Sequence, residues 1–70
     1  MKNNIVEIRK QNKIKQLQLA AAVGVSRQSI YSIEKGKFTP TVDTALKIAK
    51  FFGKPVEEIF FLDEEKKAGK

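Results

Sequence analysis

Apolar side chains recur along the chain at intervals of three and four residues, a spacing that predicts helices rather than strands. Cap-forming residues and glycines interrupt this pattern at short intervals. The first expected helix begins after Asn3 or Asn4, the next three span 16–23, 27–35 and 42–52, and a fifth begins at Pro55. Loops of a few residues connect them, so the expected fold class is all-α, a compact five-helix domain over residues 1–62. Residues 63–70 show no apolar periodicity and are expected to form a polar, frayed tail.

Side chains that face inward at helical spacing predict the core. They are Ile5, Ile8, Leu19, Val23, Ile30, Ile33, Leu46, Ile48 and Phe52. Phe38 is expected to lie beneath the loop 37–40. The run 59–62 is apolar on every side, so it can end as a helix or as a short extended strand. It also carries more apolar surface than one short helix buries, because Phe60 can face the core while its neighbours remain outside. We therefore expect Phe60, Phe61 and Leu62 to form the seam of a homodimer.

The most informative pattern lies in residues 16–35. The helix 16–23 ends at Gly24, a residue that adopts the left-handed conformation cheaply, and Ser26 can cap the next helix almost at once. Two helices joined by a three-residue turn are typical of a helix-turn-helix. Ala20 is small where the two helices must cross, and Val25 can fill the turn.

The outer face of helix 27–35 carries side chains that can read DNA. Arginine pairs with guanine O6 and N7, and glutamine pairs with adenine N6 and N7, in the major groove. Residues near the start of such a helix reach the bases first. The expected base-reading residues are Arg27, Gln28, Tyr31 and Ser32. The expected contacts to the DNA backbone are Lys15, Gln16, Ser26, Lys35, Lys37 and Thr41.

Charge and composition favour a polyanionic partner and exclude other classes. Residues 1–50 hold ten basic and three acidic side chains, and residues 51–70 hold four and five. The chain has no Cys and no His, so disulfides, the usual zinc ligands and the usual acid–base and thiol groups are missing. We therefore expect no enzyme, metal or cofactor. With no apolar span and no signal-like start, we expect a cytoplasmic protein without a membrane partner.

Residues 16–36, together with 40–49 and 55–60, resemble the lambda-repressor-like, Xre-type helix-turn-helix family, and the resemblance covers about residues 4–60. It implies a five-helix domain that binds a palindromic operator as a two-fold dimer. It also implies that Gln16 contacts a phosphate and steadies the recognition helix. Residues matching Arg27, Gln28 and Ser32 face the bases in this family, and those matching Lys35 and Lys37 follow the backbone. The positions of Arg9 and Glu34 often form an ion pair there between the first and third helices.

The chain departs from that family at two places. Lys15 stands where a Thr or Ser that caps the second helix is usual, so the helix lacks about 1 kcal/mol of capping stability. Leu17, Ala21 and Ala22 stand where polar residues are usual. Leu17 and Ala21 lie one turn apart, so they form either a docking patch for a protein partner or ordinary helix surface.

We therefore expect a sequence-specific regulator that binds double-stranded DNA and acts as a repressor. Two alternatives remain open. One is an antitoxin-like module whose main partner is a protein, and the other is a basic binder of RNA or of membrane surfaces.

Overall fold

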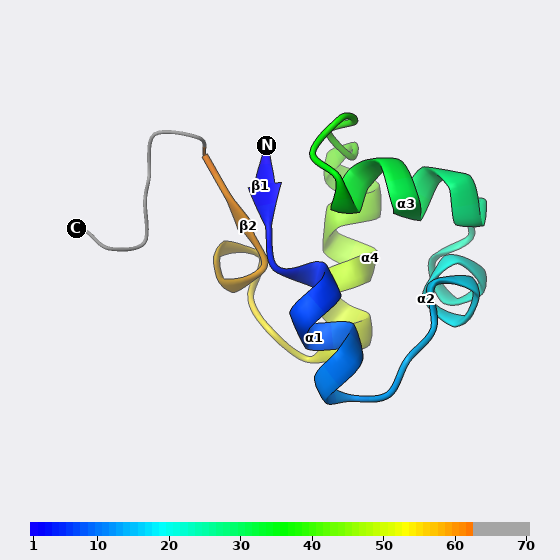
Figure 1. Cartoon of the computed structure of the whole chain (residues 1–70). Helices are drawn as coiled ribbons and strands as arrows, with labels where there is room; N and C mark the ends of the chain where they lie inside the picture. The colour runs from blue at the N-terminus through cyan, green and yellow to red at the C-terminus, as the bar shows by residue number, and fades with distance from the viewer. Residues whose placement is uncertain (63–70) are drawn as a thin grey trace.

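Four α-helices, one 3-10 turn and two very short strands make up the fold in the computed structural model, which describes residues 1–62 (Figure 1). The helices are α1 (Ile5–Gln11), α2 (Gln16–Val23), α3 (Arg27–Glu34) and α4 (Val42–Phe52). The turn η1 spans Val56–Glu58, and the strands are β1 (Lys2–Asn3) and β2 (Phe60–Phe61). The frayed tail predicted for 63–70 lies outside the described residues. No helix in the described part has the length and apolar character needed to cross a membrane.

The predicted limits of the middle helices are confirmed, except that α3 ends one residue early at Glu34, because their signals are local. The Ser26 hydroxyl accepts a hydrogen bond from Ser29 N (3.0 Å), and the Thr41 hydroxyl accepts one from Thr44 N (3.2 Å). Each cap satisfies a backbone N–H that the first helical turn leaves unpaired. At the start of α1 the cap comes from Asn3, whose Oδ1 accepts from Ile5 N (3.2 Å).

The predicted fifth helix is wrong. Within the described residues after Pro55 the chain makes a single 3-10 turn and then extends as β2, which resolves the ambiguity of 59–62 in favour of a strand. Lys2 pairs with Phe61 and Asn3 pairs with Phe60 in an antiparallel ladder. This pairing supplies backbone partners for an aromatic pair that suits an extended chain. β1 was not predicted, because two polar residues carry no apolar pattern.

Eleven apolar side chains form the buried core of residues 1–62. They are Ile5, Ile8, Leu19, Ala20, Val23, Ile30, Ile33, Ile48, Ala49, Ile59 and Phe60. Seven of them, Ile5, Ile8, Leu19, Val23, Ile30, Ile33 and Ile48, were predicted from helical periodicity, and Ala20 was expected at the helix crossing, so the local pattern determined most of the core. Phe52 is only partly buried and packs against it.

Two core predictions are wrong. Leu46 is 55% exposed, because it lines a groove open to water beside Val42 and Val56 instead of facing the core. Phe38 is 51% exposed instead of lying beneath its loop. Met1 packs against the core there, and its carbonyl oxygen would lie 3.3 Å from a Cβ placed on Gly36. The N-terminus thus lies beside the loop that carries Phe38.

Candidate nucleic-acid interface

The helix-turn-helix is formed by α2, the turn 24–26 and α3, which lie together on one side of the molecule (Figure 1). Gly24 adopts a φ of 78°, and the N–H groups of Gly24 and Val25 both donate to Ala20 O (2.9 and 3.0 Å). These bonds satisfy the end of α2 while the chain reverses direction. Ala20 is 1% exposed, so a larger side chain would force the two helices apart.

One face of the recognition helix α3 is buried against the core, and the opposite face is exposed. Ile30 and Ile33 are buried at 0% and 1% exposure. Arg27 and Gln28, its first two residues, are both exposed. A rigid back and a polar front at the helix start form the geometry by which such a helix presents side chains to base edges.

The other two expected base-reading residues lie one turn further along α3. Tyr31 is 41% exposed and Ser32 is partly buried. The Lys35 ammonium lies 5.5 Å from the centre of the Tyr31 ring, within cation–π range. Tyr31 therefore has a defined contact with a neighbouring lysine that the sequence pattern did not indicate.

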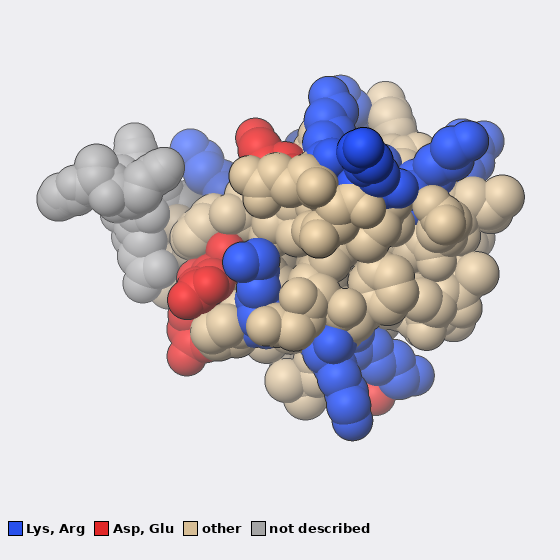
Figure 2. Space-filling view, turned by 90° about the horizontal axis from the view of Figure 1, so that it is seen from below, with Lys and Arg blue, Asp and Glu red and all other residues tan. Residues whose placement is uncertain are grey.

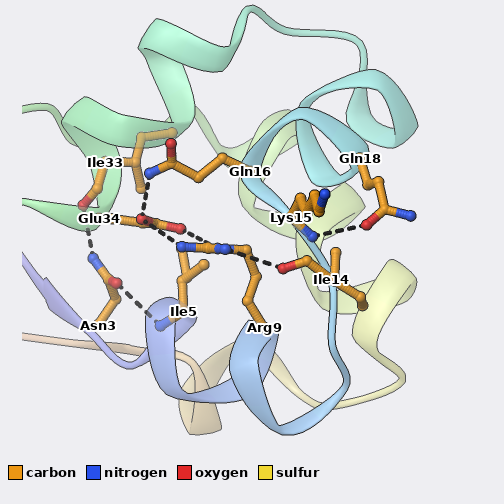
Figure 3. A network of polar contacts seen from close by, with 9 residues as sticks. All are labelled: Asn3, Ile5, Arg9, Ile14, Lys15, Gln16, Gln18, Ile33 and Glu34. Carbon is orange, nitrogen blue, oxygen red and sulfur yellow. Dashed lines mark hydrogen bonds and ion pairs between the residues drawn. The ribbon is translucent and has the colours of Figure 1, made fainter.

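A polar network anchors the last residue of α3 (Figure 3). The Glu34 carboxylate accepts from Arg9 Nε (2.7 Å), from Arg9 Nη2 (3.3 Å) and from Gln16 Nε2 (2.9 Å). Arg9 Nη1 also donates to Ile14 O (3.0 Å). Asn3 Nδ2 donates to Ile33 O (2.8 Å), so the N-terminal strand also supports the end of α3. The ion pair implied by the family resemblance is thus present and ties α1, α2 and α3 together.

The residues expected at the DNA backbone divide into two groups. Lys15, Lys35 and Lys37 are exposed. The polar groups of Gln16, Ser26 and Thr41 already make intramolecular hydrogen bonds, the first to Glu34 and the others as helix caps. Lys15 is also the N-cap residue that precedes α2, and its own side chain supplies no cap. Instead Gln18 Oε1 accepts a hydrogen bond from Lys15 N (2.8 Å), which is half of a capping box.

An open cationic groove of about 690 Å³ lies beside the start of α3. Its basic lining residues are Arg9, Lys10, Lys13, Lys15 and Arg27, and no acidic side chain lines it. Because Arg9 is paired with Glu34, the other four cations are the ones that can attract an anion.

Lys10 and Lys13 were not among the expected site residues. The acid-free stretch 8–33 was the feature of the sequence that could have indicated them. Lys13 has a φ of 57°, a left-handed conformation that costs a non-glycine residue about 1–2 kcal/mol.

Charge is distributed unevenly over the face drawn in Figure 2. Most acidic side chains in this view lie on the left, the side of β2 and η1, whereas the right edge shows only basic ones. The exposed Glu57 and Glu58 of η1 account for part of the acidic character. A polyanion is therefore attracted to the side of α2 and α3 and repelled from the side of η1.

Fold and site together define a helix-turn-helix DNA-binding domain. The sequence model of the helix-turn-helix family matches residues 5–59. An uncharacterized HTH-type transcriptional regulator of Methanocaldococcus jannaschii is 46% identical over 65 residues, covering 93% of this chain and 98% of the relative. A second, from Bacillus subtilis, is 43% identical over 65 residues, with the same coverage of both chains.

A cryptic phage CTXphi transcriptional repressor from Vibrio cholerae is 32% identical over 57 residues, covering 81% of this chain and 51% of the relative. The chain belongs to the helix-turn-helix family, as an Xre-type transcriptional regulator. Regulators of this kind are typically not enzymes.

Proposed function

We propose that the chain is a cytoplasmic, sequence-specific repressor that binds a palindromic operator as a homodimer, with α3 in the major groove. The observation that carries the proposal is the exposure of Arg27 and Gln28 at the start of a helix whose back is buried. These two side-chain types make the bidentate contacts that distinguish guanine and adenine. The Glu34 network restricts movement of α3, so its side chains meet the bases with little further ordering cost.

The cationic groove supports the same arrangement. It is lined by Arg27 as well as by Lys10, Lys13 and Lys15, so a duplex that meets α3 passes the other cations along its backbone. Contacts of this kind set register and affinity without reading sequence. Repression is supported by the phage repressor among the relatives, and cytoplasmic location by the need to reach DNA.

Dimerisation is proposed through the C-terminal segment. Leu62 is 50% exposed and Phe61 is partly buried, so both can contact a second copy, whereas Phe60 is 6% exposed and belongs to the core of its own chain. A two-fold dimer of this family type places two recognition helices about 34 Å apart, in successive major grooves.

The deciding experiment is selection of binding sites from random duplex DNA. We expect enrichment of a palindrome whose half-sites lie about 10 base pairs apart. Selection with Arg27→Ala serves as the matched control and should lose preference at one position in each half-site. Failure to enrich any sequence would contradict specific recognition and favour a basic RNA or membrane-surface binder.

An antitoxin-like module is the second candidate, because Leu17 is 63% exposed on α2 and Ala21 is exposed one turn further on. Leu17 also lines the cationic groove. A protein docked on this patch would therefore compete with DNA. Capture of a partner by the wild-type chain but not by Leu17→Glu, with the partner displacing DNA, would favour this candidate.

A further inference from the structure

The cationic groove beside the start of α3 is lined by apolar side chains as well as by charges. Leu17 lines it and is 63% exposed, more than any other leucine of residues 1–62. Ile14 packs against the core on one side and lines the groove on the other. An apolar surface is therefore open to water directly among the four cations that can attract an anion.

A DNA backbone uses the charges of this groove but gains little from its apolar side chains. Phosphates are attracted by lysine and arginine, and the affinity comes largely from the counterions that are released. Packing Leu17 against a phosphate would remove water from the anion without supplying a hydrogen bond. The composition of the groove therefore also suits a second kind of ligand, which carries acidic and apolar groups together.

The size and layout of the groove favour a protein segment as that ligand. Its volume of about 690 Å³ lies within the range of about 300–1,000 Å³ typical of ligand sites. Its cations come from separate parts of the chain: Lys10 from α1, Lys13 and Lys15 from the segment that joins α1 to α2, and Arg27 from α3. A ligand must extend across all of these parts to reach every cation, as a peptide segment in a groove does.

We propose that the cationic groove binds an acidic segment of a regulatory protein, with a large apolar side chain of the segment packed on Leu17 and Ile14. The carboxylates of the segment pair with Lys10, Lys13 and Lys15. This inference rests on the proposed function and adds a regulator that acts at the same surface. Because Arg27 also lines the groove, the segment and the operator need the same cations and exclude each other. Binding of the partner thus releases the DNA and relieves repression.

The two ligands differ in their response to salt. DNA binding weakens steeply as the salt concentration rises, because it depends on counterion release. Salt screens the charged contacts of the segment as well, but it does not weaken the burial of its apolar side chain. The affinity for the segment therefore falls less steeply with salt than the affinity for the duplex.

The test begins with selection of binders from a library of random peptides displayed on phage, with the full chain as the target. We expect enrichment of peptides in which Asp and Glu flank a Leu, Ile or Phe. A synthetic peptide of the enriched sequence should displace a labelled operator duplex, as measured by fluorescence polarisation. Enrichment of acidic peptides that lack a large apolar side chain, or of no acidic peptide, would overturn the inference.

Leu17→Gln distinguishes the two ligands. It should lower the affinity for the enriched peptide by about tenfold or more, because the apolar contact is lost while every charge remains. The slope of DNA affinity against salt should stay that of the wild type. Leu46→Gln, the same change at an exposed leucine that does not line the groove, is the matched control and should bind the peptide like the wild type. A Leu17→Gln variant that binds the peptide as tightly as this control would contradict the proposed contact.

Lys10→Gln is a second variant, and it should weaken binding of both the peptide and the duplex because both use its charge. Circular dichroism should show unchanged helix content in all three variants, since the replaced side chains are exposed. A loss for the duplex alone in Lys10→Gln would place the peptide outside the groove. A chain that enriches acidic, apolar peptides but binds no duplex sequence contradicts the proposed function and leaves the ligand chemistry of the groove intact. A chain that binds its operator but enriches no such peptide contradicts the regulator alone.

Discussion

Arg9 and Glu34 lie 25 residues apart in sequence and form an ion pair in which Arg9 Nε is 2.7 Å from Glu34 Oε2. Their side chains are 13% and 4% exposed, so water screens the pair only weakly. Gln16 Nε2 also donates a hydrogen bond to the Glu34 carboxylate. The end of the recognition helix is thus fixed to α1 and α2 at a single charged group.

Removing the acid should destabilise the fold strongly. We expect Glu34→Ala to lower the free energy of unfolding by about 3 kcal/mol, because it strands the Arg9 guanidinium in a largely buried site. Urea denaturation followed by circular dichroism measures the change. Glu7→Ala, which removes an exposed acid on α1, is the control, and its free energy of unfolding should stay near that of the wild type. An effect no larger than that of the control would show that the pair contributes little.

Arg27→Ala should change which DNA sequences are bound. The expected loss is about 1–3 kcal/mol on the preferred operator, concentrated at one base pair per half-site, because the bidentate contact to guanine is removed. Affinities for single-base variants of the operator measure it. A uniform loss across all variants would instead make Arg27 a backbone contact.

Lys37→Ala should weaken binding without changing specificity. Lys37 is exposed just after α3, where it can pair with a phosphate. We expect the slope of log K against log salt concentration to become shallower by about one unit per protomer, because one fewer counterion is released. Lys54→Ala, an exposed lysine after α4, should leave the slope unchanged. Equal slopes for wild type and Lys37→Ala would show that Lys37 does not contact a phosphate.

Lys13→Gly should have opposite effects on stability and on DNA binding. Glycine adopts the φ of 57° found at this residue more readily than lysine, so the free energy of unfolding should rise by up to about 1 kcal/mol. DNA affinity at low salt should fall, because the cationic groove loses one charge. Thermal unfolding and a salt titration measure the two effects. Unchanged DNA affinity would mean that the duplex does not reach Lys13.

Charges at the C-terminal segment should separate the dimer. We expect Phe61→Glu with Leu62→Glu to give monomers in light scattering, since Leu62 is 50% exposed and Phe61 is only partly buried. Leu62→Glu alone tests the same contact with less disturbance of β2. Dimers that survive both changes would rule out a C-terminal contact.

Much of the site was predictable from the sequence because its determinants are local. A cap at Ser26, a left-handed Gly24 and the spacing of Ile30 and Ile33 act within a few residues, and together they decide where α3 begins and which face it exposes. The identity of Arg27 and Gln28 as front residues follows from the same periodicity.

Only the tertiary structure decided the remaining features, because they depend on elements distant in sequence. The pairing of β1 with β2 stands in place of the expected fifth helix, and the exposure of Leu46 emerged only from the fold. Lys10 and Lys13 line the same open groove as Arg27, which no local pattern indicates because Arg27 lies 14 or more residues further along the chain. Periodicity reports which face of a helix is apolar, whereas exposure depends on which partner the fold places against that face.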